Sequence, residues 1–235
     1  MLSTKHFLFL YLLSISFTSI AQEKTLGISI GGGAMQSYGD ADNGLSFQPA
    51  FQAEVEINLN KRVNLITDFH AGKMVNGNYD ISAVTRPFYA RYFVTNISGV
   101  STVVTYNLFE LDKNATSWNQ AFKSLYVGVG VGVEKVNVLS IRTDATLANG
   151  EKYLFAIRES PYVQVAIPVV AGFNYYIPQS PLAVGIKGQL GIIPQDELEG
   201  YATNINGKPD FYALGSISLK YYFKKANRHN SNKGF

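Results

Sequence analysis

Seven ionisable side chains within the strand-like segments of this 235-residue chain are of the types that carry out acid–base or metal chemistry. Asp68 and His70 stand two residues apart, and such a pair can orient an imidazole for proton transfer or supply two metal ligands. Hydrolytic catalysis further requires a nucleophile beside the His, and no Ser is adjacent. A metal site usually needs three or four ligands. The seven residues are Glu54, Glu56, Asp68, His70, Glu134, Lys187 and Lys220.

Two glycine-rich segments resemble nucleotide-binding motifs only superficially. Gly128, Gly130 and Gly132 alternate with valines that continue a strand, whereas a dinucleotide motif places its glycines between a strand and a helix. Small residues there are expected to relieve crowding inside the barrel. The glycines at 31–33 lack the Lys and Ser/Thr of a phosphate loop and predict a kink near the outer rim. No cofactor is expected.

Composition narrows the fold class and the partners. The chain is 46% apolar and 16% charged, which excludes a disordered protein, and it is rich in Gly, Tyr and Phe, which favours strands. The net charge of +3 is too small to indicate nucleic-acid binding. The absence of Cys excludes disulfides, thiolate metal sites, Cys nucleophiles and a lipidated cysteine.

Apolar and polar residues alternate with period two in eight segments, which is the pattern of strands with two unlike faces. The segments are 26–30, 51–59, 63–72, 100–108, 125–134, 163–174, 182–191 and 211–223. Most are as long as the ~9–11 residues of a tilted membrane-spanning strand, while ordinary strands average ~5–6. The sequence therefore predicts an all-β protein, an eight-stranded antiparallel transmembrane β-barrel.

The two faces and the strand ends support this interpretation. One face is apolar and would meet lipid, and the other carries small and hydrogen-bonding residues suited to the interior of a narrow barrel. Aromatic residues gather near the strand ends, where they would form girdles at the headgroup level. These aromatics are Phe88, Tyr89, Tyr92, Phe93, Tyr106, Phe109, Tyr175, Tyr176, Tyr221, Tyr222 and Phe223.

The seven ionisable residues fall on the inward face of this predicted barrel. An eight-stranded barrel is filled by its own side chains, so buried charges must be paired or neutralised. Four acids face two lysines, and Arg91, a protonated carboxyl or internal water would complete the network. We expect a structural ion-pair network and no enzymatic activity. The alternative is a barrel enzyme that modifies lipid A and relies on His70.

The chain ends and loops predict the compartment and the domains. Residues 1–21 have the basic start, apolar run and small-x-small ending of a cleaved signal peptide, so export to the outer membrane is expected. The barrel would span 22–223 and a basic periplasmic tail 224–235. Long polar loops at 36–46, 76–90, 140–159 and 194–209 would lie outside, and short turns inside. The loop 110–123 is long on the short-turn side and carries the single Trp.

The final strand resembles the terminal strand that the barrel-assembly machinery recognises, with Leu219, Tyr221 and Phe223 on its apolar face. Short blocks along the mature chain are similar to the PorG-like barrel subunit of the type IX secretion machinery of Bacteroidota. These blocks include Tyr38-Gly39-Asp40, the 58–62 turn, His70-Ala71-Gly72-Lys73, Tyr106-Asn107-Leu108-Phe109 and Val165-Ala166-Ile167-Pro168.

The resemblance implies a non-catalytic outer-membrane scaffold that contacts secretion components. The periplasmic contact residues would be Trp118 in the 110–123 loop and Lys224, Lys225 and Arg228 in the tail. Other expected partners are outer-membrane lipid and, during biogenesis, the assembly machinery. A second hypothesis is a surface barrel whose four long loops bind ligands or other cells. A plain excursion at 110–123 and a solvated tail without a partner also fit the sequence.

Overall fold

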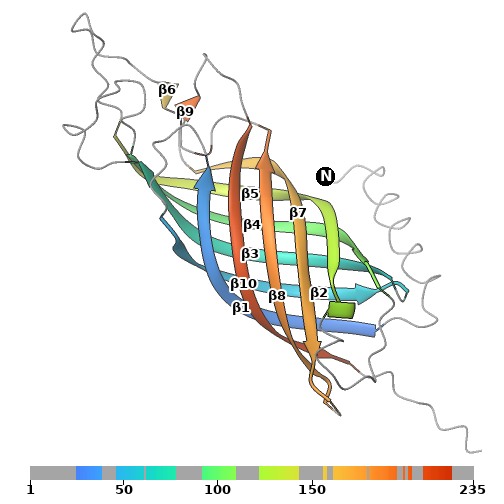
Figure 1. The fold of residues 1–235 in the computed structure, drawn as a ribbon. Coiled ribbons are helices and arrows are strands. Elements are labelled where there is room, and N and C mark those ends of the chain that lie inside the picture. The colour runs from blue at the N-terminus through green and yellow to red at the C-terminus, as the bar shows by residue number, and fades with distance from the viewer. Residues whose placement is uncertain are drawn as a thin grey trace, which may run out of the picture.

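Eight strands close into a single antiparallel barrel, as the sequence predicts, in the order β1-β10-β8-β7-β5-β4-β3-β2 (Figure 1). The structure is a computed structural model that describes residues 25–38, 46–60, 62–77, 92–109, 122–142, 156–157, 161–178, 180–194, 198, 201–202 and 209–223. The barrel strands are β1 (Thr25–Tyr38), β2 (Gln48–Asn58), β3 (Val63–Gly77), β4 (Tyr92–Asn107), β5 (Tyr126–Arg142), β7 (Tyr162–Tyr176), β8 (Leu182–Ile193) and β10 (Asp210–Tyr222).

A two-residue strand pair lies outside the barrel. The strands β6 (Ala156–Ile157) and β9 (Tyr201–Ala202) belong to the 140–159 and 194–209 segments, and they pair antiparallel with each other (Figure 1). Within the part of the chain that the structure describes, no helix has the length and apolar character needed to cross a bilayer.

Strands β3, β4 and β5 are longer than the periodicity predicts. They contain 15, 16 and 17 residues and pair with one another up to Gly77, Tyr92 and Arg142. A register shift opposite Val94 and Thr95 lies near the end of the β4–β5 pair. A tilted strand of ~9–11 residues already crosses a bilayer, so this part of the sheet extends past the thickness of a membrane at the long-loop end.

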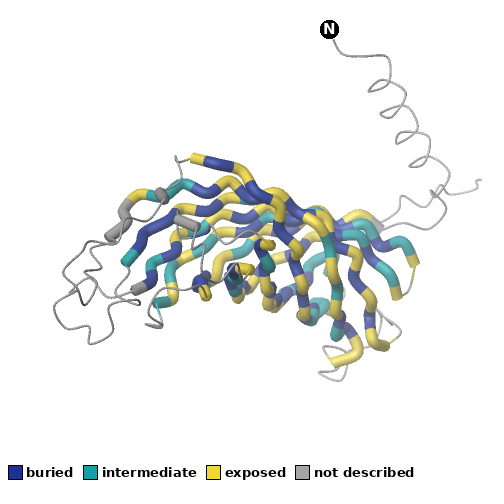
Figure 2. The backbone as a smooth tube through the Cα atoms, turned by 90° about the horizontal axis from the view of Figure 1, so that it is seen from above, coloured by how far each residue is buried: buried dark blue, intermediate teal, exposed yellow. Residues whose placement is uncertain are grey.

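Burial alternates residue by residue along the strands (Figure 2). Most of the buried strand positions carry polar side chains, and most of the exposed ones carry apolar side chains. Val129 and Val131 on β5 are 57% and 61% exposed, whereas Gln164 on β7 and Glu134 on β5 are 3% and 0% exposed. A water-soluble barrel has the opposite arrangement, because exposing apolar surface to water is unfavourable. The outer surface is therefore built to meet an apolar solvent.

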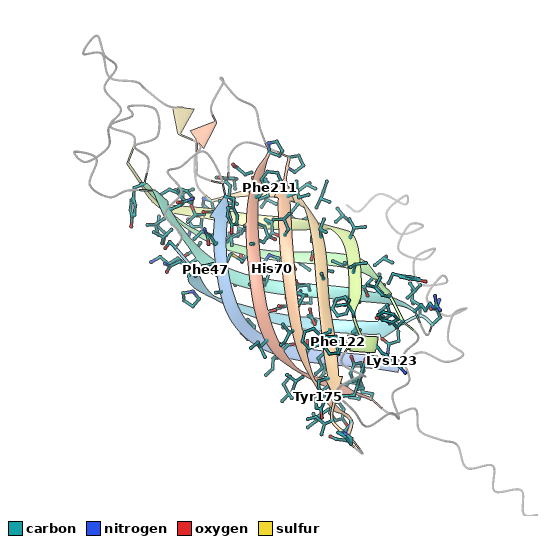
Figure 3. The ribbon with its side chains drawn as sticks, viewed as in Figure 1. Phe47, His70, Phe122, Lys123, Tyr175 and Phe211 are labelled. Carbon is teal, nitrogen blue, oxygen red and sulfur yellow. The ribbon has the colours of Figure 1, made fainter. Side chains whose placement is uncertain are left out.

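Aromatic side chains mark both ends of the barrel. In Figure 3, Phe47 and Phe211 lie toward one end, Phe122 and Tyr175 lie toward the other, and His70 is labelled between them. The end with Phe122 and Tyr175 carries the short turns, and in one of these the Asn60 Oδ1 accepts the backbone N–H groups of residues 62 and 63 at 2.8 Å.

Three predicted girdle residues, Phe93, Tyr176 and Tyr222, point inward instead. Tyr176 shares the inward face of β7 with Asn174 and packs against Tyr222, with the ring centroids 5.6 Å apart. Phe93 is 0% exposed because β4 continues to Tyr92 and keeps Phe93 on the inward face with Ile97. Tyr222 is 7% exposed because it shares the inward face of β10 with Lys220. Phe88 and Tyr89 lie outside the described residues.

The predicted position of glycines 31–33 near the outer rim is also wrong. These glycines lie in the middle of β1 and pair with β10 and with β2, so they are not at a rim. A Cβ at Gly31 would lie 2.5 Å from the carbonyl oxygen of Ile217 on β10. A close approach between β1 and β10 therefore accounts for the small residue at this position.

The interior at the long-loop end is apolar, although a polar interior is predicted from the sequence. Its buried side chains are Met35, Met74, Phe93, Ile97, Val136, Tyr162, Ala166, Ile193, Leu198, Tyr212 and Leu214. Leu198 comes from the segment after β8, is 0% exposed, and donates its backbone N–H to Asp210 Oδ2 at 2.7 Å. One residue of an outer loop thus packs into this cluster.

Truncation of Leu198 tests this anchoring. Leu198→Ala is expected to lower the free energy of unfolding by about 2 kcal/mol, the low end for a buried Leu, because a loop can partly collapse into the space. Urea titration followed by circular dichroism measures the loss, with the exposed Leu139→Ala as control. Equal effects of the two variants would show that Leu198 does not anchor the loop.

Candidate functional site

All seven predicted ionisable residues lie inside the barrel. They project from five strands: Glu54 and Glu56 from β2, Asp68 and His70 from β3, Glu134 from β5, Lys187 from β8 and Lys220 from β10. Each is at most 5% exposed. The structure brings them into one network, which we call the interior network.

Two lysines reach the acids inside the lumen. Lys187 Nζ lies 2.9 Å from Glu54 Oε1 and 2.9 Å from Asp68 Oδ2. Strands β8 and β3 are on opposite sides of the barrel in the strand order, so this side chain spans its width. Lys220 Nζ lies 3.0 Å from Glu54 Oε2 and 3.2 Å from Glu56 Oε2. Glu54 therefore bridges the two ammonium groups.

His70 lies between two carboxylates at the other end of the interior network. Its Nδ1 is 3.5 Å from Asp68 Oδ2, and its Nε2 is 3.1 Å from Glu134 Oε2. Tyr212 donates its hydroxyl to Glu134 Oε1 at 2.7 Å, and the Tyr212 hydroxyl oxygen is also 3.1 Å from His70 Nε2. A tyrosine thus closes this end of the network.

Charge is not balanced within the described part of the interior network. Four carboxylates face two ammonium groups and one imidazole. Asp68 Oδ1 is fully buried and accepts no hydrogen bond from a described residue. Arg91, which the sequence analysis offered as a further cation, lies outside the described residues. A proton bound to one carboxylate, or internal water that solvates the acids, would therefore compensate for the remaining excess of negative charge.

Five polar residues of the interior network were not predicted to belong to it, and one of them, Tyr222, was expected in an aromatic girdle. Ser29 donates to Glu54 Oε2 at 3.0 Å, and Tyr222 donates to the Glu56 carboxylate at 3.2 and 3.3 Å. Gln52 donates to Glu54, and Ser216 donates to Gln52. The fifth is Tyr212. Their inward position in the alternating pattern was the available signal, but nothing in that pattern shows which residues meet across the lumen.

The chemistry open to the interior network is proton exchange among its own members. The side chains of His70 and Glu134 are 0% exposed, and the imidazole Nε2 also contacts the Tyr212 hydroxyl at 3.1 Å. Within the described residues, no three His, Cys, Asp or Glu side chains are arranged to hold a metal ion. The arrangement is suited to filling the lumen and holding the strands in register.

The predicted assembly-signal residues lie at the seam between the first and last strands. Leu219, Tyr221 and Phe223 are 50%, 40% and 43% exposed on the outward face. Phe223 donates its N–H to the Leu26 carbonyl at 2.8 Å, which continues the β1–β10 pairing. The predicted partner contacts Trp118, Lys224, Lys225 and Arg228 lie outside the described residues.

The Tyr212 hydroxyl can be removed without changing the shape of the side chain. Tyr212→Phe is expected to lower the free energy of unfolding by about 1–3 kcal/mol, because it removes the donor to the buried Glu134 Oε1. Tyr221→Phe, on the outward face of the same strand, is the matched control and should change stability by less than about 0.5 kcal/mol. Thermal unfolding in detergent compares the two, and equal stability of both variants would contradict the role of the hydroxyl.

Comparison with known proteins finds likeness in fold alone. No protein-family model and no curated protein sequence matches the chain. Among solved structures, Neisserial surface protein A is similar with a TM-score of 0.51 and 10% identity, over 86% of this chain and 100% of that one. Ail, the attachment invasion locus protein of Yersinia pestis, gives a TM-score of 0.47 and 11% identity over the same shares. The first likeness shows that the chain has the fold of eight-stranded outer-membrane barrels.

Proposed function

We propose that the protein is an integral outer-membrane barrel without enzymatic activity, which serves as a rigid scaffold for segments outside the bilayer. The observation that carries this proposal is the inverted distribution of polarity. Apolar side chains cover the outside of the strands, while the buried ionisable residues fill the inside. Hydrocarbon is the solvent that makes such a distribution stable.

The filled lumen favours a scaffold role rather than a channel or an enzyme. Lys187 crosses the lumen, and Tyr212 on β10 reaches Glu134 on β5. The apolar cluster with Leu198 occupies the interior at the long-loop end. Contacts across the lumen hold the barrel in one shape, and buried catalytic groups without access to substrate do not turn over.

The finer proposal is that the scaffold belongs to an envelope assembly linked to protein secretion. The short sequence blocks shared with PorG-like barrel subunits support it. The signal peptide, the basic tail and the 110–123 loop supply the export route and the periplasmic contact surfaces in this proposal. Secretion components would bind at the short-turn end, where Arg62 is exposed.

A second candidate function is supported by the long-loop end. There β6 and β9 pair across two loops, and β3, β4 and β5 extend past the thickness of a membrane. Regular structure that extends beyond the membrane in this way is suited to a barrel that binds ligands or other cells through its loops.

Deletion of the gene in the native organism separates these proposals. Loss of secreted proteins, restored by the wild-type gene, is the result expected for the secretion-linked scaffold. Normal secretion with altered adhesion would favour the surface-binding barrel. A change in the mass of lipid A on overexpression, absent in His70→Ala, would contradict the non-enzymatic proposal.

A further inference from the structure

Two lysines interrupt the apolar outer surface at one level. Among strand residues whose exposure is described, Lys73 on β3 and Lys135 on β5 are the exposed charged side chains. All other charged strand residues with described exposure are buried in the interior. Neither lysine forms an ion pair with a described residue. Exposed cations on an otherwise apolar sheet face call for an anionic counterpart.

The lysines lie directly past the edge of the apolar belt. On β3, β4 and β5, the register partners Phe69, Val100 and Val133 form an outward row and are 41–49% exposed. The next outward row toward the long loops contains Ser98 and Lys135, and the row after it contains Lys73 and Asn96. The transition from large apolar to polar side chains marks the level where hydrocarbon gives way to lipid headgroups.

The stagger of the barrel brings the two lysines to the same depth. A register row can be followed around the barrel from one paired residue to the next. The row that begins at Phe69, in the middle of β3, runs through β2, β1, β10 and β8 and ends at Tyr175, near the short-turn end of β7. In the other direction, from β3 to β5, register rows rise toward the long-loop end. Asn137 is the residue of β5 in the same register row as Lys73, so it lies closer to the long loops than Lys73 does. The residue of β5 at the depth of Lys73 must be nearer the short turns than Asn137, and Lys135 is nearer by two residues.

The space between the lysines is lined by small and hydrogen-bonding residues. Two strand spacings and two residues of rise separate their Cα atoms by about 12 Å. Ala71, Ser98 and Asn96 lie on the outward face in the same two rows, and all three are exposed. Hydroxyl and amide groups between two cations suit a ligand that carries both phosphates and sugar hydroxyls.

We propose that this face, which we call the lysine pair, binds the phosphorylated headgroup of a glycolipid in the leaflet at the long-loop end. The proposal rests on the outer-membrane location proposed above, with the long loops outside. Lys73 and Lys135 contact phosphate, and Asn96 and Ser98 bond to the sugar. The acyl chains pack on the row of Phe69, Val100 and Val133.

Native mass spectrometry of the full-length protein in detergent, titrated with diphosphorylated lipid A, tests the lysine pair. Each lysine near a charged surface is expected to contribute about fivefold in affinity, so Lys73→Gln and Lys135→Gln together should weaken binding about 25-fold. Lys123→Gln is the matched control, because Lys123 is exposed at the opposite end of the barrel (Figure 3). It should leave the affinity for lipid A unchanged.

The remaining outcomes separate this inference from the proposed function. Dephosphorylated lipid A should bind to the wild type as weakly as lipid A binds to the double variant. Equal binding of lipid A by wild type and double variant would overturn the inference, as would an equal loss in Lys123→Gln. Equal dependence of phosphatidylglycerol binding on both lysines would overturn the assignment to a glycolipid. Insertion into vesicles is measured first, and its failure would contradict the proposed function itself.

Discussion

Replacement of Lys187 by Met should lower the free energy of unfolding by about 3–5 kcal/mol, because it removes the ammonium group that Glu54 and Asp68 share and leaves an excess of buried negative charge. Lys187 Nζ is 2.9 Å from both Glu54 and Asp68, and all three side chains are at most 5% exposed. The Met side chain has similar length and volume, so the loss reports on charge. Urea unfolding in micelles, followed by circular dichroism, measures it.

Two further variants identify the cause of that loss. Lys123→Met removes a lysine from an exposed position and should change stability by less than about 0.5 kcal/mol. The double variant Lys187→Met with Asp68→Asn should be more stable than Lys187→Met alone, because one uncompensated carboxylate is then absent. A Lys187→Met protein as stable as the wild type would show that the lumen is hydrated enough to solvate these acids.

Gly99→Val is the second change with a large expected effect, about 3 kcal/mol or more. Gly99 on β4 is the register partner of His70 on β3 and of Glu134 on β5, so the contact between these two side chains passes over it. A Cβ at Gly99 would lie 1.8 Å from Glu134 Oε2. Any larger residue must displace the carboxylate, which breaks its hydrogen bonds and overpacks the lumen.

The matched control for Gly99→Val is Gly215→Val. Gly215 on β10 is exposed on the outward face, and a Cβ there would meet no atom within 4 Å. A valine at Gly215 should be neutral or slightly stabilising, because it adds a strand-favouring apolar side chain to the lipid-facing surface. Thermal unfolding of both variants decides between the two faces, and a larger loss at Gly215 would contradict the assignment of inside and outside.

The sequence predicts well whether a strand residue faces the interior or the outside of the barrel, but it predicts poorly which residue that side chain contacts. Period-two alternation is a property of a single strand, so it placed Glu54, Asp68 and Lys187 on the inward side before any pairing was known. Which of them meet depends on how the strands are staggered when the barrel closes. The contact from Lys187 on β8 to Asp68 on β3 spans 119 residues of sequence, and no local pattern encodes it.

The same limit explains the errors near the long-loop end. Phe93 is of a residue type that is typical of a girdle, but β4 continues to Tyr92, and this continuation directs the Phe93 side chain inward. Leu198 stands in a polar segment, and its burial depends on the opening left by the surrounding strands. The small residue at Gly99 has no local explanation either, since the side chains that pass over it come from β3 and β5.

The central claim is that lipid, and not protein or water, covers the outward side chains. The chain has no Cys, so single cysteines can be placed at the exposed positions 163, 165, 167, 169 and 171 of β7 and spin-labelled in the vesicle-inserted protein. Collisions with oxygen and with a water-soluble nickel chelate then report depth in the bilayer. The account predicts high oxygen and low nickel access, strongest at the middle positions. High nickel access along the whole strand, or burial of all five labels from both reagents, would contradict it.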